Sequence, residues 1–188
     1  MNYWAQGTLI LLAIIFSNCS LKSENTYSSS IDSLIQILHK SDTLIINLEK
    51  EEIKTYYNII DSTIKSIKTE HSDSLIWEDA KLLSKYNRFI KSFKYHSKKT
   101  NYLKNELEYS FNQLTNLKQD IINNTIPEDS IPIYYSMEVD IVAEIDSLVK
   151  SQIQFIDNKI TEYKTTNQEI LKIIRKLESN NLDSLQEN

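Results

Sequence analysis

The chain has 188 residues and a formal charge of −5, with one glycine, two prolines and one cysteine. Phosphate-binding loops, dinucleotide-binding turns and nucleophile elbows need glycine where the backbone approaches a ligand, so this composition argues against those enzyme classes. The modest negative charge argues against nucleic acid as a partner, and the shortage of turn residues favours a few long helices.

The first predicted element is an apolar run from Thr8 to Phe16, which is followed by Ser17, Asn18 and Cys19. Nine residues are too few for a membrane-spanning helix, which takes about 20 residues. They suit the apolar core of a signal peptide. Cys19 is the only cysteine, so it cannot form a disulfide within the chain.

This segment resembles a bacterial lipoprotein signal peptide, with residues 16–19 (Phe-Ser-Asn-Cys) in the place of the lipobox. The resemblance implies that residues 1–18 are removed, that Cys19 is lipidated, and that acyl chains hold the protein on a membrane. Residues 19–30 are rich in serine and predict a flexible tether. Ser20 is not the aspartate that typically retains such proteins at the inner membrane. The expected location is therefore the cell envelope, at the periplasmic face of the outer membrane.

Three helices are expected after the tether, at about residues 31–70, 74–124 and 131–178, with residues 179–188 as a frayed tail. The second helix has the clearest pattern, because mostly apolar or aromatic residues recur at alternating spacings of four and three. Its predicted buried positions are Leu82, Tyr86, Phe89, Phe93, His96, Thr100, Leu103, Leu107, Ser110, Leu114, Leu117 and Ile121.

The first and third helices carry stripes of their own. The stripe of the first helix continues across Ser41 and Asp42, which predicts one uninterrupted helix: Ile31, Leu34, Leu38, Ser41, Ile45, Leu48, Glu52, Tyr56, Ile60, Ile64 and Ile67. The third stripe has a mean spacing of about 3.6 residues, the plain α-helical period. It comprises Tyr134, Met137, Ile141, Ile145, Leu148, Gln152, Ile156, Ile160, Tyr163, Asn167, Ile170, Ile174 and Leu177.

Short connections between helices make sequential helices antiparallel neighbours. The predicted fold is therefore all-α, a long antiparallel up-down-up three-helix bundle that resembles an extended coiled coil. The alternative is a dimer in which helix pairs from two chains complete one bundle. The sequence leaves the oligomeric state open.

The most distinctive charge pattern lies in the second helix, where eight basic residues and no acidic residue occur between Asp79 and Glu106. This basic run consists of Lys81, Lys85, Arg88, Lys91, Lys94, Lys98, Lys99 and Lys104. A run of one sign on a helix is usually a solvated face, but it can also dock an anionic partner. The expected partner is an anionic envelope component or an acidic protein surface.

A polar layer is expected inside the bundle, because His96 and Glu52 both occupy predicted buried positions. Folding the chain near residue 72 brings the two side chains together, so we predict a contact between them. His39, His71 and His96 lie too far apart along the predicted helices to share a metal ion. No cofactor is expected.

The chemistry of the chain favours a cell-envelope lipoprotein whose helical bundle has a non-catalytic structural or binding role. No nucleophile with a partnered base can be proposed from residue spacing, and the cysteine is assigned to lipidation. The alternative is an enzyme or small-ligand carrier that uses a cavity within the bundle. A pocket lined by convergent polar groups would favour that alternative.

Overall fold

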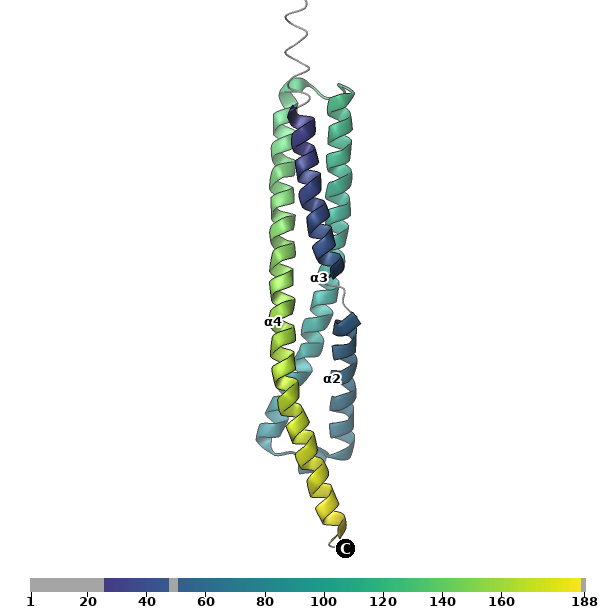
Figure 1. Ribbon diagram of the computed structural model, residues 1–188, viewed down its shortest axis with the longest axis vertical. Coiled ribbons are helices and arrows are strands. Elements are labelled where there is room, and N and C mark those ends of the chain that lie inside the picture. The colour runs from purple at the N-terminus through teal and green to yellow at the C-terminus, as the bar shows by residue number, and fades with distance from the viewer. Residues whose placement is uncertain (1–25, 48–50, 187–188) are drawn as a thin grey trace, which may run out of the picture. The chain divides into compact units, whose positions relative to one another are not determined.

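The computed structural model describes residues 26–47 and 51–186, and every regular element in this part of the chain is a helix (Figure 1). The predicted signal peptide and Cys19 lie outside the described residues. The helices occupy residues 26–47, α2 (Glu51–Glu70), η1 (Ser72–Ser74), α3 (Trp77–Ile122), η2 (Glu128–Ser130) and α4 (Ile131–Gln186).

Helical structure extends beyond both ends of the predicted bundle. The first helix already includes residues 26–30, which were expected to belong to the tether. The Ser30 hydroxyl donates to the Thr26 carbonyl four residues earlier, and the ring centres of Tyr27 and Tyr135 lie 5.4 Å apart. At the other end, α4 continues to Gln186, although a frayed tail was expected from residue 179.

The first predicted helix is continuous across Ser41 and Asp42, as expected, because residues 26–47 form one helix. Residues 48–50 separate it from α2 and are not described. The second helix was predicted at 74–124, but the 3-10 turn η1 precedes it and α3 begins at Trp77. The predicted start of the third helix at residue 131 is correct.

The end of α3 is set by Asn124, which adopts a positive φ of 54°. The Asn124 N–H donates to the Ile121 carbonyl and the Thr125 N–H donates to the Asp120 carbonyl. This pairing caps the last carbonyls of a helix, and asparagine is one of the few residues besides glycine that tolerates the left-handed conformation. A chain without glycine after its N-terminal segment thus ends its second predicted helix with asparagine.

The predicted stripe of α3 is confirmed almost completely. Eleven of its twelve positions are buried, and only Leu82 is partly exposed. In the first helix, the described positions Ile31, Leu34, Leu38, Ser41 and Ile45 are buried as well. A spacing of alternating threes and fours therefore places these side chains on one face of each helix.

The predicted stripe of α4 is wrong in its N-terminal part. Tyr134, Met137 and Ile141 are 46, 56 and 39 % exposed, whereas Val142 is buried. The inward positions follow the same three-four rhythm as α3: Ile131, Tyr135, Glu138, Val142, Ile145, Val149, Gln152 and Ile156. Two adjacent apolar stripes run along this part of α4, and the predicted 3.6-residue spacing resulted from passing from one stripe to the other.

The described chain divides into two compact units. The first unit contains two segments, the chain up to Thr43 and Lys104–Ser147. In this unit the first helix is antiparallel to α3, because Asp32 pairs with Lys118 and His39 contacts the ring of Phe111. It is parallel to α4, since Tyr27 contacts Tyr135 and the Ser41 hydroxyl donates to Asp146.

The second unit contains Leu44–Leu103 and the chain from Leu148 onward. Here α3 is antiparallel to α4, because Lys176 pairs with Asp79 and the ring of Phe155 contacts that of Tyr95. The charges of the units differ: residues 26–43 and 104–147 hold eleven acidic and three basic residues, whereas 44–103 and 148–188 hold fourteen acidic and seventeen basic ones. The second unit is therefore the cationic one.

Candidate functional site

The core of the second unit positions α3 against α4 through a cluster of aromatic rings. The Tyr163 ring of α4 lies 5.8 Å from Tyr86, 5.9 Å from Phe89 and 5.9 Å from Phe93. Tyr56 of α2 completes the cluster at 4.6 Å from Tyr163. Rings at these separations contribute about 0.5–1.5 kcal/mol per pair beyond their burial, so the two helix faces beside the cluster are held in a defined register.

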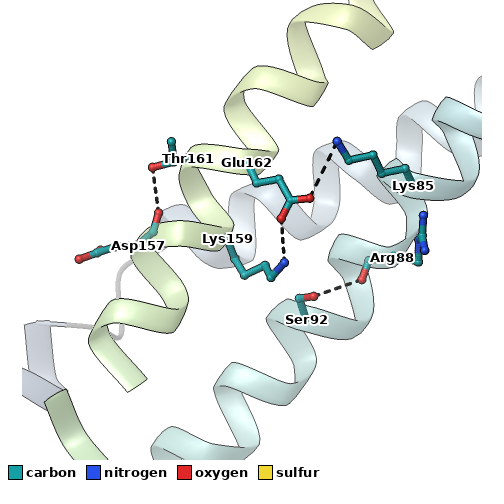
Figure 2. Close-up of polar contacts among 7 residues, drawn as sticks. All are labelled: Lys85, Arg88, Ser92, Asp157, Lys159, Thr161 and Glu162. Carbon is teal, nitrogen blue, oxygen red and sulfur yellow. Dashed lines mark hydrogen bonds and ion pairs between the residues drawn. The ribbon is translucent and has the colours of Figure 1, made fainter. Parts of the chain in front are cut away.

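Directly beside this cluster, α3 and α4 form a pocket of about 270 Å³. We call it the cationic pocket, and it is lined by Lys85, Arg88, Phe89, Ser92, Lys159 and Glu162. Figure 2 shows the Glu162 carboxylate of α4 pointing between Lys159 and Lys85, with Arg88 nearby. Thr161 points away from α3 on the other side of α4, so it does not belong to the pocket.

Glu162 is the only acidic residue among those that line the cationic pocket. Lys159 Nζ donates to Glu162 Oε2 at 2.7 Å, and Lys85 Nζ lies 3.9 Å from Glu162 Oε1. The hydrogen bond from Lys159 and the positive charges of Lys159, Lys85 and Arg88 hold the pKa of Glu162 below its usual range. The carboxylate is therefore ionised at neutral pH, and three cationic groups face one anionic group.

The basic run predicted from the sequence is solvent-accessible but does not form a single face. Lys104 belongs to the first unit, whereas the other seven residues belong to the second. Lys94 Nζ lies 5.3 Å from the centre of the Tyr57 ring, and Lys99 Nζ lies 4.4 Å from that of Tyr102. These residues surround the exposed part of α3, because their spacings differ from those of one helical stripe. Only Lys85 and Arg88 enter the cationic pocket.

Sequence reasoning missed the contribution of α4 to this site. Lys159 and Glu162 flank the buried stripe of α4, as Lys85 flanks that of α3. In coiled coils, flanking positions of facing helices form ion pairs. The heptad pattern of both helices could have suggested such pairs, but the sequence does not give the axial register that decides which residues meet.

His96 is buried, with 2 % of its surface exposed. Its partner in α4 is Gln152, whose Nε2–H donates to His96 Nδ1 over 2.6 Å. The predicted partner Glu52 has a side chain outside the described structure, so that contact stays a prediction.

Within the described ranges, no group of three or more His, Cys, Asp or Glu side chains is placed to hold a metal ion. The same part of the chain contains no helix that is both long enough and apolar enough to cross a membrane. Comparison of the chain with protein-family models, curated proteins and solved structures gives no match.

Proposed function

We propose that this chain is a lipid-anchored cell-envelope protein whose helical domain binds an anionic partner and has no catalytic role. The anchor is Cys19, exposed as the new N-terminus after removal of residues 1–18, and the proposed location is the periplasmic face of the outer membrane. This part of the proposal rests on the resemblance of residues 16–19 to a lipobox. The partner is an anionic envelope component or an acidic protein surface.

The observation that carries the binding role is the excess of positive charge in the cationic pocket. Lys85, Arg88 and Lys159 line this pocket with a single carboxylate, that of Glu162, whose pKa their positive charges lower. A pocket whose charged side chains were all paired with one another would contain equal numbers of cationic and anionic groups. The remaining N–H donors face solvent, where they attract anions and accelerate their association.

The alternative function, binding of a small ligand in a cavity of the bundle, is favoured by one feature of the same pocket. Its lining includes four charged side chains and the Ser92 hydroxyl, which are the convergent polar groups that a ligand site requires. The buried stripe beneath it is filled by aromatic rings. A small ligand would therefore bind between the helices at the surface rather than inside the core.

For the architecture, we infer an up-down-up three-helix bundle in which the helix at residues 26–47 and α2 together take the place of the first predicted helix. The antiparallel pairing of α3 with the first helix in the first unit and with α4 in the second supports this inference. Distances between spin labels on the first helix, α3 and α4 would test it, since a helix-exchanged dimer gives distances that depend on protein concentration.

The binding role is tested by measuring association with anionic vesicles and with an acidic protein surface at salt concentrations from about 50 to 300 mM, over which the Debye length falls from roughly 14 to 6 Å. A variant of α3, Lys85/Arg88/Lys91/Lys94→Gln, should lose most of the salt-sensitive binding. The matched control removes four exposed cations elsewhere in the second unit: Lys54/Lys164/Lys172/Arg175→Gln. Equal binding by wild type and the α3 variant would end the proposal.

A further inference from the structure

The cationic pocket has donors that its own carboxylate does not use. The Arg88 guanidinium has no hydrogen-bond or ion-pair partner among the described side chains, although its charge acts on Glu162. Lys85 lies at 3.9 Å from Glu162, too far for a hydrogen bond, and only Lys159 donates to the carboxylate. The pocket thus has a net charge of two positive units and three donor groups on two helices.

The arrangement of these donors selects among anions. A guanidinium presents a rigid fork that binds two oxygens of one group, whereas a lysine ammonium acts as a point charge. Lys85 extends from α3 and Lys159 from α4 toward Glu162, and Arg88 lies beside Lys85 on α3 (Figure 2). Three cationic groups from two sides suit a tetrahedral anion with three free oxygens better than a planar carboxylate with two.

The charge and volume of the pocket narrow the class of anion further. A phosphomonoester carries about −1.5 to −2 charges at neutral pH, which balances the two excess positive charges. The volume of about 270 Å³ lies at the lower limit of small-molecule pockets, which hold roughly 300–1,000 Å³. The pocket therefore fits a phosphoryl group whose organic part extends into solvent. The Ser92 hydroxyl also lines the pocket, and it donates to the Arg88 carbonyl.

We propose that the cationic pocket binds the phosphoryl group of a phosphomonoester, with Arg88 as the bidentate ligand and with Lys85 and Lys159 on either side. This inference rests on the proposed anion-binding function and specifies its ligand chemistry. Glu162 is the internal competitor of that ligand, because it holds Lys159 in place while occupying part of the positive field.

The first experiment measures the affinity of the full chain for two kinds of probe. Glycerol 3-phosphate represents a soluble phosphomonoester, and binding is followed by calorimetry. Vesicles containing phosphatidic acid present the same group on a lipid, and phosphatidylglycerol vesicles of equal surface charge present a phosphodiester. Binding of glycerol 3-phosphate assigns a soluble source, and binding of phosphatidic acid vesicles alone assigns a lipid headgroup. In either case, the proposal predicts weaker binding to phosphatidylglycerol vesicles than to the phosphomonoester probe.

The second experiment compares variants of the pocket with a matched variant on the same helix. Arg88→Gln should weaken phosphomonoester binding about tenfold or more, because it removes the charged hydrogen-bond donor of the ligand. Lys91→Gln removes the same charge from an exposed residue outside the pocket lining and should change affinity less than about threefold. Glu162→Gln should tighten binding about fivefold, since it removes a negative charge next to the ligand.

Equal losses of affinity for Arg88→Gln and Lys91→Gln, or equal binding to the two kinds of vesicle, would overturn the proposal that the pocket binds a phosphomonoester. Either result would leave the general anion-binding role intact, because the whole basic surface would then act through its charge. Loss of affinity in Glu162→Gln would overturn the assignment of Glu162 as a competitor and with it the proposed geometry. Absence of salt-sensitive binding to every anion would overturn both proposals.

Discussion

The buried pair formed by His96 and Gln152 allows a quantitative test of the packing of the second unit. The two side chains are 2 and 5 % exposed, and their hydrogen bond is 2.6 Å long. Gln152→Leu keeps a side chain of similar volume and removes the amide N–H donor. His96 Nδ1 would then stay buried without the hydrogen bond from Gln152. An unsatisfied buried group costs about 1–3 kcal/mol, and we expect Gln152→Leu to lower the free energy of unfolding by about 2 kcal/mol.

The double variant His96→Leu/Gln152→Leu replaces both polar partners with apolar side chains. Its cost should be no greater than that of either single variant, because no polar group of the pair remains to be desolvated. The expected coupling energy is therefore at least about 1 kcal/mol, well above the scatter of roughly 0.5 kcal/mol for independent sites. Urea unfolding followed by far-ultraviolet circular dichroism provides the four free energies, with Lys91→Gln as an exposed control.

Additive costs for the two single variants would refute the reasoning, because they would show that His96 and Gln152 do not interact in solution. A stabilising effect of Gln152→Leu alone would do the same. If the double variant gains stability but loses a uniform oligomeric state, the pair acts as a polar layer that favours one register at a cost in stability.

Three further predictions follow from the sequence and the packing. Cys19→Ala should abolish metabolic acyl labelling and move the protein to the soluble fraction, whereas a variant that stays membrane-bound through residues 1–18 would contradict lipidation. Burial raises the pKa of Glu138 above its usual value, so the folded state loses stability as pH rises through the window between the unfolded and folded pKa values. Glu138→Gln should accordingly raise the urea midpoint at about pH 7 and have little effect near pH 4, and a gain of equal size at both would be inconsistent with this cause. Val142→Ala should cost about 2 kcal/mol of unfolding free energy and Met137→Ala less than about 0.5 kcal/mol, and the opposite order would restore the stripe predicted from the sequence.

The sequence alone determined the helical character of the chain and the buried face of its second predicted helix. Alternating spacings of three and four around Phe89 and Leu107 leave one periodicity and one phase, so the inward side of α3 could be predicted residue by residue. The end of that helix was also predictable, because asparagine is the best available residue for a left-handed cap in a region without glycine.

The tertiary structure decided which of two apolar stripes of α4 faces inward. Tyr134 and Met137 are at least as hydrophobic as Tyr135 and Glu138 of the inward stripe. A helix with two adjacent apolar stripes has no unique inward face until its neighbours are placed. Their exposure and the burial of Val142 result from packing between helices. The spacing of apolar residues along one helix carries no information about that packing.

The candidate site depends on the same kind of information. The sequence located Lys85 and Arg88 in a basic run, but it could not bring Lys159 and Glu162 to them. That meeting depends on the axial offset of α4 against α3. Helix periodicity repeats every seven residues, so neighbouring registers satisfy the same pattern, and only the fit of particular side chains such as Tyr163 and Gln152 selects one.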